Sequence, residues 1–241
     1  MKMKFSILTL FPEMFPGLLN HSIPGRALKN KKFSIETFNI RKYSHLKNNS
    51  IDGKPIGGGA GMIMRPDILQ KALNHVLEKQ KGSSIKTIYF TPKGRVLKQD
   101  VIKEITNYDN IIIICGRYEG IDHRFVENNN VDEISVGDYI LTGGEIPAFI
   151  LIDACIRFIP EVLGNRKSLN SESFENTLLE YPQYTKPLDW EGKRVPKVLF
   201  SGNHVAVEKW RLTKARETTK KARPDLWKLY KNKLRGKKWI Y

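Results

Sequence analysis

The sequence predicts an α/β protein in which a mostly parallel β-sheet is followed by a small, basic, α-helical C-terminal domain. Three observations predict this class: strand-like and helix-like segments alternate between residues 4 and 159, four isoleucines at 111–114 are stopped by glycine, and the pattern changes beyond Pro160. A short β-branched run that ends near a glycine is typical of a buried central strand in a parallel sheet. The alternation itself favours parallel βαβ units.

The segments before the isoleucine run follow this alternation. Alternating apolar and polar residues predict strands at 4–10, 33–40 and 85–90. Apolar residues at helical spacing predict helices at 66–81 and 97–105. Gly82 ends the predicted helix at 66–81, and residues 91–94 form a turn after the strand at 85–90. Pro12 suits the first turn of a further helix.

The longest apolar run covers residues 146–159 and predicts a buried helix. It is shorter than the roughly 20 residues that a bilayer requires and carries Asp153 and Arg157. The basic, partly apolar N-terminus continues into Pro12 and Glu13 instead of a small-residue cleavage site, which argues against a signal peptide. We therefore expect a soluble, cytoplasmic protein without a membrane partner.

Positive charge is concentrated near the C-terminus. The 241 residues carry a formal net charge of +16, and residues 201–241 hold 13 Lys and Arg against 3 Asp and Glu. Aromatic residues are interleaved with these cations at Trp210, Trp227, Tyr230, Trp239 and Tyr241. This mixture is typical of an RNA-contacting surface; a solvated face or an anionic membrane surface is the alternative.

Two glycine-rich segments follow the predicted central strand closely and predict a binding site. Residues 115–122 contain Gly116 and Gly120, and residues 136–145 contain three more glycines. Loops after parallel strands meet at the carboxyl edge of the sheet, where α/β folds bind ligands, and glycine lets the main chain approach a ligand closely. Two tight turns without a ligand are the alternative.

Other site types have little support. The glycine loop at 57–62 lacks the Gly-Lys-Ser/Thr ending of a phosphate-binding loop. Cys115 and Cys155 stand in apolar runs and are interpreted as buried thiols in a reducing compartment. The five histidines are scattered without metal-ligand spacing, so no metal site is predicted.

Seven motifs together resemble those of the TrmD family, the bacterial tRNA (guanine-N1)-methyltransferases of the SPOUT class. The motifs are Leu-Phe-Pro-Glu-Met-Phe at 10–15, Gly-Gly-Gly-Ala-Gly-Met at 57–62, Cys-Gly-Arg-Tyr-Glu-Gly-Ile-Asp at 115–122, Ser-Val-Gly-Asp-Tyr at 135–139, Leu-Thr-Gly-Gly-Glu at 141–145, Arg-Phe-Ile-Pro at 157–160 and Leu-Phe-Ser-Gly-Asn-His at 199–204. Each is weak alone, but the ordered set covers nearly the whole chain and is highly specific. Ala60 departs from the usual proline of the second motif.

The resemblance implies a deep trefoil knot between about Tyr89 and Pro147, and a homodimer whose active site is shared between subunits. It implies a knotted domain at 1–162, a linker at 163–175 and a tRNA-binding helical domain at 176–241. It further implies that S-adenosylmethionine is the methyl donor. The residues that would bind it are Tyr89, Phe90, Thr91, Pro92, Gly116, Tyr118, Glu119, Gly120, Ser135, Val136, Gly137, Asp138, Tyr139, Ile140, Leu141, Gly143, Gly144 and Pro147.

Two catalytic residues follow from the same resemblance. Arg157 matches the family's arginine and would stabilise charge on guanine O6, although an ion pair with Asp153 one turn earlier is the alternative. Glu172 precedes a Ser-Phe pair where the family has the aspartate that acts as general base. Glutamate keeps the carboxylate but adds a methylene, and a solvated linker acid is the alternative.

The implied reaction is methyl transfer to N1 of guanosine at position 37 of tRNA, beside the anticodon. Candidate tRNA contacts are Asp52, Gly61, Arg211 and Lys214. One alternative is a related knotted RNA methyltransferase with another target nucleoside. The other is a non-catalytic RNA-binding protein, which the intact glycine loops disfavour.

Overall fold

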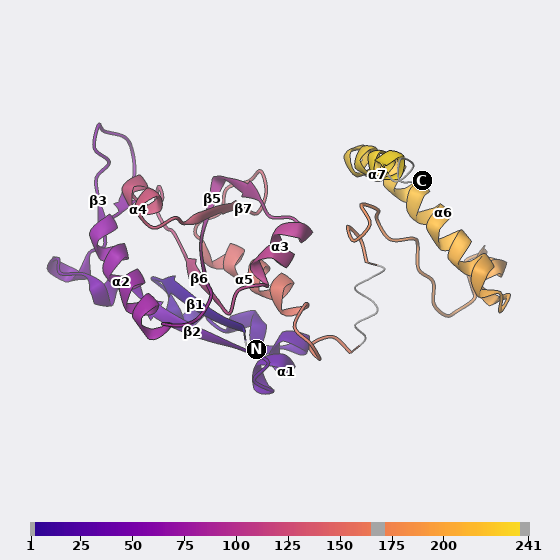
Figure 1. Ribbon diagram of the computed structural model, residues 1–241, viewed down its shortest axis with the longest axis horizontal. Coiled ribbons are helices and arrows are strands. Elements are labelled where there is room, and N and C mark those ends of the chain that lie inside the picture. The colour runs from indigo at the N-terminus through magenta and orange to yellow at the C-terminus, as the bar shows by residue number, and fades with distance from the viewer. Residues whose placement is uncertain (1–2, 165–171, 237–241) are drawn as a thin grey trace. The chain divides into compact units, whose positions relative to one another are not determined.

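The computed structural model describes residues 3–164 and 172–236, and the chain divides between Gly164 and Asn165 into an N-terminal and a C-terminal unit (Figure 1). Most of the predicted linker at 163–175 lies outside the described residues. The predicted α/β class and the helical C-terminal region are both confirmed. None of the helices within the described residues is long and apolar enough to span a membrane.

A five-stranded parallel sheet forms the centre of the N-terminal unit. Its strands are β1 (Met3–Thr9), β2 (Phe33–Asn39), β5 (Ile85–Val96), β6 (Asn110–Ile114) and β7 (Asp132–Ser135), in the spatial order β2-β1-β6-β5-β7. Each neighbouring pair is parallel. The isoleucine strand β6 occupies the middle position and is completely buried, as the β-branched run predicts.

Helices cover both faces of this sheet (Figure 1). Ile111 and Ile113 point into one apolar core, whereas Ile112 and Ile114 point into the other, because successive side chains of a strand alternate between faces. The first core also holds residues of α1 (Ser22–Lys29), α3 (Gln99–Ile105) and α5 (Glu145–Ile156). The second holds residues of α2 (Pro66–Lys79) and α4 (His123–Asn128).

Strand β5 extends further than the sequence predicts. Phe90 and Arg95 both pair with Ile134 of β7, so the predicted turn at 91–94 is a bulge within one long strand. The bulge brings Gly94 against the main chain of Glu133, where a Cβ atom would collide. The trefoil knot implied by the resemblance stays a prediction.

Shorter elements complete the N-terminal unit. They are the strands β3 (Asp52–Gly53) and β4 (Ile63–Met64), which pair antiparallel, and the 3-10 helices Pro12–Met14, Gly17–Asn20, Ile40–Tyr43 and Lys47–Asn49. The glycine loop at 57–62 lies between β3 and β4, as a loop should.

The C-terminal unit is built on two helices, α6 (His204–Ala222) and α7 (Pro224–Gly236). The Asn203 side chain caps α6 by accepting a hydrogen bond from the Ala206 N–H at 3.0 Å, and Pro224 begins α7 as predicted. Leu178, Ala215 and Tyr230 form a small buried core. A 3-10 helix (Lys197–Phe200) and the hairpin of β8 (Asp189–Trp190) and β9 (Lys193–Arg194) precede the helices.

Both cysteines are free and buried, as predicted. Burial raises the pKa of the Cys155 thiol to about 12. Burial, reinforced by the nearby Glu145 carboxylate, also raises the pKa of the Cys115 thiol well above its ordinary value.

Candidate active site

A cavity of about 440 Å³ lies beside the β5 bulge and the ends of β6 and β7, at the carboxyl edge of the N-terminal unit's sheet. Its walls come from the β5 bulge, from the loop that follows β6 and from the loop between β7 and α5. This volume falls within the range of small-molecule sites. The two glycine segments therefore meet at one site, as their positions after parallel strands predict.

The cavity brings together the predicted donor-binding residues with one exception. Asp138 is exposed and does not line it. The lining also includes residues that were not predicted: Lys93, Arg117, Ile121, His123, Val126, Glu133, Ile134 and Thr142. Most of these are sequence neighbours of predicted residues. For Arg117 and Thr142, the signal in the sequence was that they lie within the motifs at 115–122 and 141–145.

Two glycines make the close approach of the loops possible. The Gly144 N–H donates a hydrogen bond to the Gly116 carbonyl at 3.0 Å, which joins the second loop to the first. A Cβ on Gly144 would lie 2.7 Å from Cys115 Cα, and one on Gly116 would lie 2.6 Å from the Tyr89 ring. Any larger residue at either position would force the main chain of Cys115 or the Tyr89 ring to shift.

A buried ion pair lies at the junction of these loops. Glu145, at the start of α5, is 1% exposed, and its Oε2 lies 2.8 Å from Arg117 Nη2. Its Oε1 accepts a 2.7 Å hydrogen bond from the Thr9 hydroxyl at the end of β1. Arg117 also donates to the Thr142 carbonyl at 3.2 Å, and its guanidinium lies 4.4 Å from the centroid of the Phe11 ring. One carboxylate thereby connects β1, the loop after β6 and helix α5.

This ion pair leaves two polar atoms incompletely satisfied. Within the described residues, Arg117 Nε has no acceptor, and Glu145 Oε2 has no well-aligned hydrogen-bond donor although Nη2 lies close. Removing one partner of a buried pair costs much more than an exposed pair contributes, because the remaining charge stays desolvated.

Tyr89 separates the cavity from the core on the α2 side. Its ring is 8% exposed, and burial raises the pKa of its hydroxyl, so it is neutral at pH 7. Gly116 and Gly120 both lie against this ring. An apolar wall with a neutral hydroxyl suits an adenine ring better than a charged group.

The glycine loop at 57–62 reaches the cavity through Glu119. The Glu119 N–H donates to the Met62 carbonyl at 3.0 Å, and the Met64 N–H donates to the Gly120 carbonyl at 2.9 Å. Gly61 lies against the Glu119 side chain, and a Cβ there would collide with it. Asp52, the other predicted tRNA contact of this unit, lies in β3 and accepts from the Ser50 hydroxyl at 3.1 Å.

The remaining predicted residues lie elsewhere. Arg157 is the partly buried C-terminal cap of α5, whose first residue follows Gly144. At 1.5 Å per residue, the 12 residues of α5 place Arg157 about 18 Å from the glycine loops along the helix axis. Arg157 and the cavity at the sheet edge of the same chain are therefore not brought together.

Glu172 and Arg211 line a second cavity, of about 330 Å³, within the C-terminal unit. Lys214 does not line it and lies 2.7 Å from Glu217, one turn along α6. The structure therefore brings the predicted base next to one predicted tRNA contact.

Comparison with known proteins agrees with the motifs. The family model described as tRNA (Guanine-1)-methyltransferase TrmD matches residues 3–229. A tRNA (guanine-N(1)-)-methyltransferase of Zymomonas mobilis is 49% identical over 227 residues, which cover 94% of this chain and 90% of that protein. One of Brucella ovis is 46% identical over 225 residues, covering 93% and 91%. With a family model and relatives that span almost its entire length, the chain belongs to the TrmD family of tRNA (guanine-1)-methyltransferases.

Proposed function

We propose that the protein transfers a methyl group from S-adenosylmethionine to N1 of guanosine at position 37 of tRNA. The observation that carries the proposal is the single cavity at the sheet edge, into which both glycine loops of the family's motifs project main chain. Its relatives are named for methylation of tRNA guanine N1. Position 37 and the donor's identity follow from the family resemblance.

The cavity fits S-adenosylmethionine in shape and chemistry. The glycines of both loops expose main chain to the cavity, which suits the edge of an adenine, and the Tyr89 ring suits its face. The Glu119 carboxylate lines the same cavity and suits a cationic sulfonium. S-adenosylmethionine supplies an electrophilic methyl group when bound, and alignment with the acceptor nitrogen accounts for several kcal/mol of the barrier.

The chain's own residues supply the remaining chemistry. Glu172 takes the proton from guanine N1, and a carboxylate acting as general base contributes about 10²–10⁴ in rate. Arg157 donates to guanine O6 as negative charge moves onto that oxygen.

We further infer a homodimer in which one subunit's donor cavity works with the partner subunit's Arg157 and Glu172. Two observations support this arrangement. Arg157 lies at the far end of α5 from its own donor loops. Ile146 and Ile150, one turn apart on α5, are 47% and 42% exposed, and such exposed apolar residues on a mostly buried helix suit a subunit interface.

The function is tested with labelled S-adenosylmethionine and two tRNA transcripts, one with guanosine and one with adenosine at position 37. Label on the first alone, recovered as 1-methylguanosine and lost in Glu172→Gln, is the expected result. Label recovered as another nucleoside would move the protein to a different target. Tight tRNA binding without any label would indicate a binding protein.

The shared site is tested by mixing Gly144→Ala, which has a damaged donor cavity, with Glu172→Gln, which lacks the base, at a concentration of S-adenosylmethionine too low for Gly144→Ala to bind it. If the site is shared, random mixed dimers contain one intact site in two, and about a quarter of wild-type activity returns. If each subunit works alone, the mixture stays inactive.

A further inference from the structure

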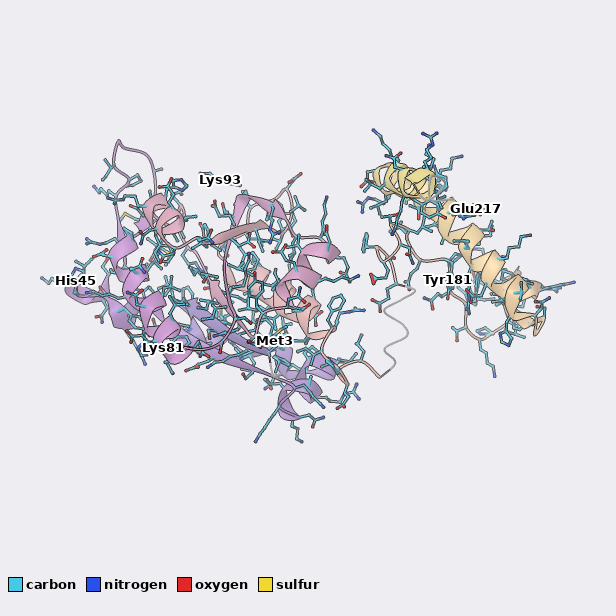
Figure 2. All side chains as sticks on the ribbon, in the orientation of Figure 1. Met3, His45, Lys81, Lys93, Tyr181 and Glu217 are labelled. Atoms are coloured by element: carbon cyan, nitrogen blue, oxygen red, sulfur yellow. The ribbon has the colours of Figure 1, made fainter. Side chains whose placement is uncertain are left out.

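The charged side chains that line the donor cavity balance one another. Among the described residues, and apart from His123, the lining holds two cations and two carboxylates. The cations are Lys93, which lies on the β5 bulge and is labelled in Figure 2, and Arg117. The carboxylates are Glu119 and Glu133. The lining by itself therefore gives the cavity no preference for a cationic or an anionic ligand.

A further carboxylate lies directly behind this wall. Glu145 is almost completely buried and does not line the cavity, but its Oε2 lies 2.8 Å from Arg117 Nη2. Arg117 in turn donates to the carbonyl of Thr142, which is a lining residue, at 3.2 Å. The ion pair therefore stands against the cavity. With Glu145 included, the described residues place two cations against three carboxylates there, an excess of one negative charge.

The methyl donor and its spent form differ by one charge. S-adenosylmethionine carries a sulfonium besides its ammonium and carboxylate groups, so it has one net positive charge. When the methyl group leaves, the electron pair of the broken C–S bond stays on sulfur, and S-adenosylhomocysteine is a thioether without net charge. A cavity with one negative charge in excess is complementary to the first ligand and not to the second.

We propose that Glu145 makes the donor cavity prefer S-adenosylmethionine to S-adenosylhomocysteine. Its carboxylate cancels the charge of Arg117, which leaves the lining with one carboxylate in excess over Lys93. Because the spent donor lacks the sulfonium, it loses this attraction, and its release is favoured. The proposal rests on the proposed function, because it takes S-adenosylmethionine as the methyl donor.

An ion pair that only holds the two glycine loops together would act differently. The two ligands share the adenosine and the amino-acid part, so a distorted cavity weakens the binding of both. Loss of the Glu145 charge weakens the binding of the cationic ligand alone. The ratio of the two dissociation constants therefore separates the charge of Glu145 from its contribution to the packing of the loops.

Isothermal titration calorimetry with the full-length protein measures both dissociation constants at pH 7. Salt is kept low, because it screens the interaction. In Glu145→Gln the preference for S-adenosylmethionine should be about tenfold smaller than in the wild type, the effect of a unit charge about 10 Å away in a partly desolvated site. A ratio equal to that of the wild type would overturn the proposal.

The double variant Arg117→Gln/Glu145→Gln tests the charge balance. It removes one charge of each sign, so the preference should return to that of the wild type even if both ligands bind more weakly. It also leaves no buried charge without a partner, which makes it more stable than the single variant. A double variant with the ratio of Glu145→Gln would contradict the proposal.

Two further variants are matched controls. Gly144→Ala disturbs the contact of the loops without changing any charge, and it should weaken both ligands equally. Glu36→Gln removes one carboxylate from β2, where it pairs with Lys79 outside the cavity lining, and it should leave the ratio unchanged. A fall of the ratio in either control as large as in Glu145→Gln would count against a specific role of Glu145.

The lower stability expected for Glu145→Gln does not obscure this result. A ligand that binds only the folded chain draws unfolded molecules back to the folded state. The apparent affinities of both ligands therefore fall by the same factor, and that factor cancels in their ratio.

Failure of this proposal differs from failure of the proposed function. A wild type that binds neither ligand would remove the proposed function, and the role of Glu145 with it. A wild type that binds S-adenosylmethionine and methylates tRNA, together with an unchanged ratio in Glu145→Gln, would remove the role of Glu145 alone.

Discussion

The donor cavity of the N-terminal unit and the cavity of the C-terminal unit are built in different ways. The donor cavity is formed by loops that approach so closely that Gly116 and Gly144 have no room for a Cβ atom, and one buried ion pair fixes their junction. The C-terminal cavity is formed by side chains, several of them charged and partly exposed. The first therefore depends on main-chain shape, and the second on charged and aromatic side chains. Substitutions in the two should therefore fail in different ways.

The largest effect is expected from Glu145→Gln. Without the carboxylate, the Arg117 side chain, which is only 20% exposed, stays largely desolvated beside Phe11 without a counter-charge, and the free energy of unfolding should fall by about 3 kcal/mol. Urea unfolding at pH 7 measures this loss. Glu127→Gln is the control, because that side chain is 68% exposed and, among the described residues, pairs with His123 alone, and it should change stability by less than about 0.5 kcal/mol. A similar small change in Glu145→Gln would show that the junction does not depend on this charge.

Gly144→Ala should have the next largest effect, on donor affinity. Its Cβ would lie 2.7 Å from Cys115 Cα, and overpacking of this kind costs roughly 1–3 kcal/mol, enough to weaken S-adenosylmethionine binding about tenfold or more. Isothermal titration calorimetry measures the affinity. Gly53→Ala, where no atom lies within 4 Å, should bind the donor normally. Normal binding by Gly144→Ala as well would contradict a cavity that depends on main-chain shape.

A smaller effect, confined to RNA, is expected on the C-terminal unit. Lys220 and Lys221 are exposed at the end of α6. Their joint replacement by glutamine should make the slope of log K for tRNA binding against log salt concentration shallower by about 0.9 per lost phosphate contact. Filter binding between low and physiological salt measures the slope. Lys29→Gln in the N-terminal unit should leave it unchanged. An equal change of the slope in Lys29→Gln would show that the N-terminal unit contacts phosphates as well.

The smallest effect concerns the partly exposed ion pairs that Arg95 of β5 forms with Glu104 and Asp132. Hydrogen bonds from the Arg95 guanidinium hold the pKa of Glu104 below its ordinary value of 4.5. A carboxyl with a lowered pKa contributes stability above pH 4.5 that is lost as pH falls through the folded value.

This contribution should be under about 1 kcal/mol, because Glu104 is 44% exposed and the pair is screened by solvent. Unfolding of wild type and Glu104→Gln, followed from pH 6 to pH 3, should give stability curves that converge at acidic pH. Curves that stay parallel would mean that the ion pair contributes no stability in this range.

Much of the fold was predictable because its signals are local. The isoleucine run at 111–114 predicts a central strand and the helical spacing at 66–81 predicts a helix, and the structure contains both. The glycine loops could be assigned to one site because parallel strands all end at the same edge.

Other features depend on partners that sequence does not name. β7 begins with Asp132 and Glu133, and it is a strand because β5 pairs with it on both sides of the bulge. The burial of Glu145 was not predicted, since a glutamate at a helix start is usually solvated and its partners, Thr9 and Arg117, are distant along the chain. The cavity that Glu172 shares with Arg211 was not predicted, because it forms only where α6 and α7 pack against residues 172–181.

The burial of both cysteines has a consequence for chemical labelling. With pKa values raised far above neutrality, neither thiol forms a reactive thiolate while the chain is folded, although Cys115 directly precedes the donor loop. A thiol reagent therefore reacts only with molecules that have opened. The rate of its reaction therefore measures how often the N-terminal unit opens. A bound methyl donor that holds this unit closed would slow modification of the cysteines, even without contacting them.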